Sequence, residues 1–353
     1  MIKPKELLEE KAKLFVYEQE QASRDVPVFY NPVMKHNRDI SVLMLQTEKR
    51  ALQCCDLLAG NGVRSIRLLQ ETTTIKHVTI NDYDTRATEL IQKHLENNKI
   101  SFALQDQEDL QQKERPRVTL TNLEGTKLLL ASSGFDYIDI DPFGSPNEFL
   151  DAACKRIARN GILAVTMTDT SAPAGSYPDA CMRKYWAVPC EGLRKHEVGL
   201  RIVIRKIQLV AAQYDKALEP ILCYNKDHYY RFYFRCVKGK QKTNYILSQH
   251  GVWNQEPDCG PLWLGLLAEP ERVQELIEQT ADESIKDWLS IIVSENSLEQ
   301  PGYYHHMNEV QKVLGSTKKE ELIEQFPQDI TQSHYEGNAI RSNKTLEEIK
   351  KAR

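Results

Sequence analysis

The chain has 353 residues, with 46 Lys plus Arg against 50 Asp plus Glu, and 41% of its residues are apolar. This composition excludes a disordered or fibrous chain, and the length predicts two domains. No apolar run approaches the roughly 18 residues of a membrane-spanning helix, and the charged start MIKPKELLEE lacks the apolar core of a secretion signal. We therefore expect a cytoplasmic protein. The formal net charge of −4 argues, at first sight, against a polyanionic partner.

Strands alternate with helices over most of the chain. Short apolar runs predict strands, and the segments between them carry apolar residues at helical spacing. The predicted strands are 51–58, 77–82, 118–122, 135–141 and 161–169, followed by a long helix at 194–213 and by two closely spaced strands at 218–224 and 229–237. β-α repeats that end in a hairpin predict an α/β fold with a Rossmann-like, mainly parallel sheet and an antiparallel hairpin at its end.

The pattern changes after residue 239. Lys238–Lys242 is polar and predicts a linker. Beyond it, amphipathic segments predict helices at 271–280, 283–293, 308–314 and 319–326. We expect a larger domain at 1–239 and a smaller, helix-rich domain at 240–353.

A glycine-rich turn follows the first predicted strand of the sheet. Gly60-Asn-Gly62 stands between this strand and a helix, and Asp82 ends the next strand about 20 residues later. Glycines let a backbone approach a nucleotide closely, and an acid at this distance can hold ribose hydroxyls. The pattern indicates an adenosine-containing ligand but does not distinguish a nicotinamide cofactor from S-adenosylmethionine, and a turn that only packs a helix has similar residues.

The fourth predicted strand ends in Asp139-Ile-Asp141-Pro-Phe143-Gly-Ser-Pro. This resembles the Asp/Asn-Pro-Pro-aromatic motif of amino-methyltransferases. An exocyclic base amine is a poor nucleophile, because its lone pair is delocalised into the ring. A carboxylate such as Asp141 can accept its N–H and remove the proton, while an aromatic side chain stacks on the base. The alternative is a tight turn in which Asp141 caps the next helix.

Five blocks of sequence carry a more specific resemblance. They are Phe29–Val42 (FYNPVMKHNRDISV), Asp141–Pro146, Val165–Thr170, Asp227–Arg231 and Gly260–Gly265 (GPLWLG). In this order, across nearly the whole chain, they resemble the tRNA (guanine-26-N2)-dimethyltransferase family of class I S-adenosylmethionine-dependent methyltransferases. The resemblance implies transfer of one or two methyl groups from S-adenosylmethionine to the N2 atom of a guanine in tRNA.

The resemblance also implies roles for individual residues. Asp141 matches the catalytic acid of the family. Arg38, Arg64 and Asp82 match cofactor-binding residues of the family. The family's Asp-Ala pair beside the adenine stands in this chain as Glu124-Gly125. Phe29 and Phe143 match aromatic residues of the base pocket.

Cysteines offer little support for a metal site. Members of the family often carry two C-x-x-C pairs before the GPLWLG block, but this chain has no C-x-x-C at all, and only His250 and Cys259 stand near the expected positions. Two ligands do not close a structural zinc site. We therefore predict no metal.

Charge is unevenly distributed along the chain. The segment 183–206 has seven Lys or Arg against two Glu, and 341–353 has five against two, whereas 254–299 has two against eleven acids. Alternation along 229–237 also puts Tyr229, Arg231, Tyr233 and Arg235 on one face of a strand. These basic segments, including Arg201 and Arg205, predict a surface for tRNA on the larger domain and the C-terminal tail of a monomeric enzyme.

Two other functions remain open from the residues alone. An adenine N6-methyltransferase would use the same cofactor and the same Asp-Pro-aromatic chemistry, although a second proline usually stands where this chain has Phe143. A non-catalytic RNA-binding module with a methyltransferase fold would not need Arg64, Asp82 and Asp141 together.

Overall fold

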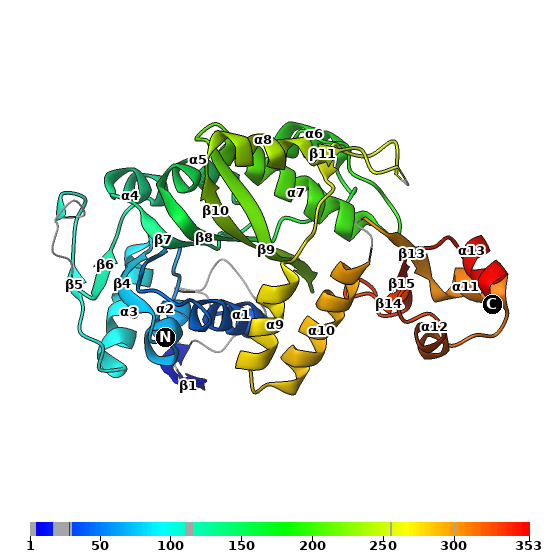
Figure 1. Cartoon of the computed structure of the whole chain (residues 1–353). Helices are drawn as coiled ribbons and strands as arrows, with labels where there is room; N and C mark the ends of the chain where they lie inside the picture. Colours follow the sequence, from blue (N-terminus) through cyan, green and yellow to red (C-terminus); the bar gives the residue numbers. More distant parts are fainter. Residues whose placement is uncertain (1–4, 17–27, 29, 110–115, 255, 299–300) are drawn as a thin grey trace. The chain divides into compact units, whose positions relative to one another are not determined.

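The computed structural model describes residues 5–16, 28, 30–109, 116–254, 256–298 and 301–353 (Figure 1). The chain packs into two compact units, Met1–Thr166 and Met167–Arg353. The predicted boundary after residue 239 marks a change in sequence pattern and lies inside the second unit. Among the described residues, no helix is long and apolar enough to cross a membrane.

A parallel sheet forms the core of the first unit. Its spatial order is β5-β6-β4-β3-β7-β8, and every neighbouring pair with a described register is parallel. The strands are β3 (Leu52–Asp56), β4 (Ile75–Asn81), β5 (Ala103–Leu104), β6 (Val118–Thr121), β7 (Phe135–Ile140) and β8 (Ile157–Met167). The prediction of a mainly parallel α/β sheet is confirmed.

Helices cover both faces of this sheet. Figure 1 shows α4 and α5 on one side of the strands and α2 and α3 on the other. Their bounds, with that of the preceding helix α1, are α1 (Lys35–Gln46), α2 (Val63–Glu71), α3 (Thr85–Asn97), α4 (Gly125–Ala131) and α5 (Asn147–Arg156). The helical spacing in α3 is confirmed by the burial of Ala87, Leu90, Ile91 and Leu95.

The order of the strands locates the ligand crevice. After β3 the chain moves to β4 and β6 on one side, and later places β7 on the other side of β3. Ligands of such sheets bind beyond the carboxyl ends of the strands where the order reverses, which here is between β3 and β7. The turn after β3 and the Asp141 loop after β7 both lie at this edge.

The N-terminal segment forms a hairpin that the sequence did not predict. β1 (Lys5–Glu9) and β2 (Ala12–Val16) pair antiparallel, and β2 contacts α2 and α3. The side chain of Asn98 accepts from the Lys13 backbone N–H at 2.9 Å and donates to the Lys13 carbonyl at 2.7 Å. The hairpin is thereby attached to the end of α3.

The second unit contains the predicted hairpin. β9 (Lys216–Lys226) and β10 (Tyr229–Lys238) pair antiparallel around a short turn, in which Asp227 has a φ of 49°. The long helix α7 (Lys195–Ala212) packs against β9, and the shorter α6 (Pro178–Tyr185) packs against α7. Hairpin and long helix are both confirmed.

The predicted polar linker at 238–242 is wrong. Helix α8 (Lys240–Ser248) begins there, directly after Gly239, and buries Thr243 and Ile246. Because only one narrow face of this helix is buried, most of its residues are polar, and the sequence does not distinguish it from a loop.

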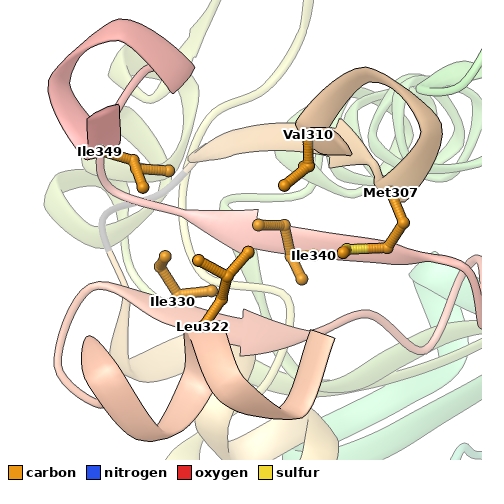
Figure 2. Packing of buried hydrophobic residues seen from close by; sticks show 6 residues of the cluster. All are labelled: Met307, Val310, Leu322, Ile330, Ile340 and Ile349. Carbon is orange, nitrogen blue, oxygen red and sulfur yellow. The ribbon is translucent and has the colours of Figure 1, made fainter. Parts of the chain in front are cut away.

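The rest of the second unit is mainly helical, as predicted, but its described residues also form two small sheets, β11-β12 and β13-β15-β14. Its elements are β11 (His250–Gly251), β12 (Leu262–Trp263), α9 (Pro270–Gln279), α10 (Glu283–Ser297), β13 (Tyr303–His306), α11 (Met307–Leu314), α12 (Lys319–Gln325), β14 (Ile330–Gln332), β15 (Ala339–Ser342) and α13 (Leu346–Ala352). Figure 2 shows the apolar cluster that joins the last of them: Met307, Val310, Leu322, Ile330, Ile340 and Ile349. This cluster forms a separate core for the C-terminal residues.

Candidate active site

The glycine turn after β3 is held by Asp82. Gly60 and Gly62 have positive φ angles of 57° and 76°, which glycine adopts without strain. The Asp82 carboxylate, just beyond β4, accepts the backbone N–H of Gly60 at 2.8 Å and that of Asp84 at 3.0 Å. Burial raises the pKa of Asp82, and these hydrogen bonds oppose the rise. The structure therefore brings the turn and Asp82 together, as the sequence indicated.

Glu124 and Gly125 lie at the start of α4, after β6. Both Glu124 carboxylate oxygens accept backbone N–H groups, from Thr126 at 2.7 Å and Lys127 at 2.9 Å. Burial raises the pKa of this exposed carboxyl, but the hydrogen bonds outweigh it and the net pKa is lowered. A Cβ atom at Gly125 would lie 3.1 Å from the Phe149 ring, so this position is tightly packed. Glu124 thus caps a helix N-terminus in this structure.

Asp141 follows β7 and is bound by Arg64 from the first turn of α2. The Nη2 atom of Arg64 donates to Asp141 Oδ2, while Nη1 lies 3.5 Å from Asp139 Oδ2. Asp139 is fully buried, whereas the Asp141 side chain retains 21% of its exposure. A carboxylate that is held on one side and open on the other can accept a proton from a ligand.

Acidic groups outnumber the basic group at this edge. Asp56 at the end of β3, Asp139 and Asp141 all interact with the single guanidinium of Arg64. The pKa of Asp56 is raised to about 7, because burial and the charge of Asp139, which raise it, outweigh the charge of Arg64, which lowers it. Arg64 is therefore the counter-charge of the cluster, in addition to any contact with a ligand.

Arg38, predicted to bind a cofactor, belongs to a second cluster centred on Glu9 of the N-terminal hairpin. Its Nε atom donates to Glu9 Oε1 at 2.7 Å, and its Nη1 atom donates to the Asn31 carbonyl at 3.1 Å. Arg67 also donates to Glu9, at 3.0 Å. Burial raises the pKa of Glu9, but hydrogen bonds and charge from Arg38 outweigh it and bring the pKa to about 2. A ligand carboxylate would have to share Arg38 with Glu9.

Of the two aromatic residues predicted to line the base pocket, the structure describes Phe143 but not Phe29. Phe143, in the loop after β7, is 71% exposed, and Gly144 beside it has a φ of 91°. A flat base can therefore cover the Phe143 ring. Phe29 lies outside the described residues, so its predicted place in the base pocket remains a prediction.

Sequence reasoning missed the polar residues that hold these groups. Asn37 and Ser41 on α1 are both fully buried and contact Arg64. They stand four residues apart, one helical turn, within the Phe29–Val42 block. Two polar residues at that spacing on a helix were the available signal.

The tRNA surface predicted around Arg201 and the 229–237 strand is wrong in part. Arg201 is fully buried, pairs with Glu197 at 2.9 Å and donates to the carbonyls of Trp263 and Gly265. Arg231 is also fully buried, with its guanidinium 4.5 Å from the centre of the Tyr233 ring. Tyr229 and Tyr233 are buried as well, and Arg235 is partly buried. Arg201 and Arg231 therefore satisfy internal acceptors and an aromatic ring, so these two residues offer no surface to RNA.

A group of possible metal ligands lies in the second unit. Val188 and Gly260 exchange two backbone hydrogen bonds, and the ligand atoms of Cys190, Glu256 and Cys259 lie within 4.8 Å of one another. The Glu256 carboxylate, however, is paired with Arg194. A structural zinc site needs four ligands, and here one of three is already engaged by a cation.

We accordingly expect that protein purified from zinc-containing medium and then dialysed contains well below one zinc per chain. The Glu256 carboxylate is engaged by Arg194, and the group of Cys190, Glu256 and Cys259 supplies no fourth ligand. Elemental analysis of wild type and of Cys190→Ser measures this. Stoichiometric zinc in the wild type that is lost in Cys190→Ser would contradict the prediction and assign the site to these residues.

The chain is similar in sequence and in fold to known proteins. The family model of N2,N2-dimethylguanosine tRNA methyltransferases matches residues 8–259. The tRNA (guanine(26)-N(2)/guanine(27)-N(2))-dimethyltransferase of Aquifex aeolicus is 33% identical, with 96% of this chain and 93% of the relative covered, and the tRNA (guanine(26)-N(2))-dimethyltransferase of Thermococcus kodakarensis is 40% identical over 79% of each. The solved structure of Trm1 from Pyrococcus horikoshii with S-adenosyl-L-methionine has a TM-score of 0.83 and 30% identity, with 98% of both chains covered.

Proposed function

The chain belongs to the N2,N2-dimethylguanosine tRNA methyltransferase family, and we propose that it transfers one or two methyl groups from S-adenosylmethionine to the exocyclic N2 atom of guanine 26 in tRNA. The observation that carries this proposal is Asp141, at the switch point of the sheet, held by Arg64 and followed by the exposed Phe143. The relatives from Aquifex aeolicus and Thermococcus kodakarensis are both named for guanine 26, and the former also for guanine 27.

The residues at the sheet edge fit an adenosine-containing cofactor. The positive φ angles of the Gly60–Gly62 turn bring backbone close to the crevice, and the Asp82 carboxylate has lone pairs beyond those used by Gly60 and Asp84. Asp82 would hold the ribose hydroxyls, and Glu124 with Gly125 would border the adenine. Arg38 and Arg64 remain the proposed partners of the methionine part. When bound, S-adenosylmethionine supplies an electrophilic methyl group.

Asp141 is the proposed catalytic base. Its carboxylate accepts one N–H of the guanine amine, which directs electron density onto N2, and then takes the proton that methylation releases. Phe143 stacks on the base after the nucleotide has left its helix. Arg64 keeps the carboxylate in place. Enzyme with labelled S-adenosylmethionine and unmodified bulk tRNA should yield labelled methylguanosines; labelled methyladenosine would indicate an adenine methyltransferase, and no label a non-catalytic module.

For tRNA binding, we propose the surface around α6 in place of the buried residues. Tyr177, Met182 and Trp186 are exposed there, together with Arg183 of α6. Lys195, at the start of the helix α7 that packs against α6, is exposed as well. The Lys206 ammonium lies 3.0 Å from the centre of the Trp186 ring. Aromatic and basic side chains together suit unpaired bases and phosphates. The C-terminal residues 240–353 remain a proposed tRNA-binding domain, and we place the enzyme in the cytoplasm as a monomer.

The double substitution Arg183→Glu, Lys195→Glu is expected to weaken tRNA binding by roughly 10-fold and to reduce the slope of log Kd against log salt by about 2, since two phosphate contacts are lost. Filter binding over a salt series measures both. The double substitution Lys76→Glu, Lys93→Glu, at exposed lysines of β4 and α3, makes the same change in net charge and is the control. Binding that matches the wild type at every salt concentration would remove the α6 surface from the proposal.

A further inference from the structure

Two buried residues of α1 hold the guanidinium of Arg64. Its Nη1 atom donates to Asn37 Oδ1 at 2.8 Å and to Ser41 Oγ at 2.7 Å, while Nη2 donates to Asp141. Asn37 and Ser41 are both fully buried. One nitrogen of Arg64 thus contacts α1, and the other contacts the proposed base.

The two acceptors on α1 are themselves fixed. The Asn37 Nδ2 group donates to Thr166 Oγ1 at 3.2 Å, which directs Oδ1 towards Arg64. The Ser41 hydroxyl donates to the Asn37 carbonyl at 2.9 Å, so its oxygen lone pairs are available to the guanidinium. Side chains that are held at both ends retain few alternative rotamers, and they can therefore orient a partner.

Without these contacts Arg64 would have a competing partner. Asp139 Oδ2 lies 3.5 Å from Nη1, and its carboxylate is fully buried. A guanidinium released from Asn37 and Ser41 would turn towards Asp139, because a bidentate pair with a buried carboxylate is favourable. Nη2 would then move away from Asp141, and the proposed base would lose its fixed position.

We propose that Asn37 and Ser41 are positioning residues for methyl transfer, which act through Arg64 to fix the carboxylate of Asp141. This inference rests on the proposed function of Asp141 as the base. It gives Arg64 a role towards the base that does not depend on cofactor contact. Because neither residue is assigned to substrate or cofactor, their loss should lower turnover at saturating cofactor. It can alter the Kd for S-adenosylmethionine only through Arg64, which is also a proposed partner of the methionine part.

The test begins with Asn37→Ala and Ser41→Ala. Each is expected to lower kcat, measured at saturating S-adenosylmethionine, roughly 10- to 100-fold, the loss typical of a misplaced catalytic group. The Kd for S-adenosylmethionine is measured alongside, because Arg64 is also a proposed partner of its methionine part. Thr47→Ala is the matched control, because this residue, the C-cap of the same helix, donates its hydroxyl to the Leu43 and Met44 carbonyls. It should retain wild-type kcat. Asn37→Ser, which keeps an oxygen acceptor, replaces Asn37→Ala if that variant is insoluble.

A double-mutant cycle separates positioning from a loss of structure. In an Arg64→Gln background, Asn37→Ala should lower kcat by less than about 2-fold, since the group through which it acts is gone. Independent, multiplicative losses would overturn the inference, as would a full rate in Asn37→Ala or a loss confined to cofactor affinity. A wild-type enzyme that methylates no guanine would instead refute the proposed function, so the two failures are distinguishable.

Discussion

Asp141→Ala is expected to lower kcat for methyl transfer by roughly 10²- to 10⁴-fold, the range that a positioned general base contributes. The substitution removes the group that accepts the amine proton, while the glycine turn and Asp82, which would hold the adenosine, lie on other strands. The Kd for S-adenosylmethionine should therefore change little. Single-turnover kinetics with saturating cofactor and tRNA, together with calorimetric cofactor binding, measure the two quantities separately.

Asp141→Asn sharpens the same test. The amide oxygen can still accept a hydrogen bond from Arg64, but the group cannot take up a proton at neutral pH. We expect Asn to be nearly as inactive as Ala at this position. Asp136→Asn is the control, because Asp136 lies at the other end of β7 and accepts from Arg50 and from the Gln53 backbone. An active Asp141→Asn enzyme would move the base elsewhere.

The second large effect concerns stability. Glu9→Gln is expected to lower the free energy of unfolding by about 3 to 5 kcal/mol, because Arg38 and Arg67 both lose a buried counter-charge. All three side chains are almost entirely buried. Urea unfolding at pH 7 measures this. Glu10→Gln is the matched control: its partner Lys35 is 41% exposed, so we expect a loss of less than about 1 kcal/mol.

The pH dependence of stability gives an independent measure of Glu9. Its pKa is about 2 in the folded protein, against an ordinary value of 4.5 for a glutamate. Because the folded pKa is the lower one, the ionised form stabilises the fold above pH 4.5, and this contribution, about 3 kcal/mol, disappears as the pH falls towards 2. The difference between wild type and Glu9→Gln should therefore shrink over this window. A constant difference would show that Glu9 does not act through its charge.

The sequence predicted best those helices and strands whose apolar residues recur at a regular spacing within one short segment. Strand alternation and helical spacing located the parallel sheet, and the glycine turn, Asp82 and Asp141 fell at its carboxyl edge because all three follow strands. The N-terminal hairpin was missed because it is short and charged, and its attachment to Asn98 spans 85 residues of sequence. Such distant contacts leave no periodic signal.

The prediction of the tRNA surface was wrong mainly at arginines whose charge is buried in the folded protein. Arg201 was predicted on the surface because arginine usually is, but its acceptors are the carbonyls of Trp263 and Gly265, more than 60 residues away. The partner of Arg341 is Glu197, 144 residues away. A basic residue with a distant partner has the same sequence signature as one that binds phosphate, so only the folded chain separates them.

Methylation of one amine on one base of tRNA can be tested for both its position and its atom with matched tRNA transcripts. The enzyme is given S-adenosylmethionine and transcripts with guanine, adenine or inosine at position 26, and the nucleosides are identified by mass spectrometry. Inosine retains the guanine ring but lacks the N2 amine. We predict N2-methylguanosine or N2,N2-dimethylguanosine at position 26 of the first transcript alone. Equal methylation of the inosine or adenine transcript, or methyl groups on adenine, would contradict the account.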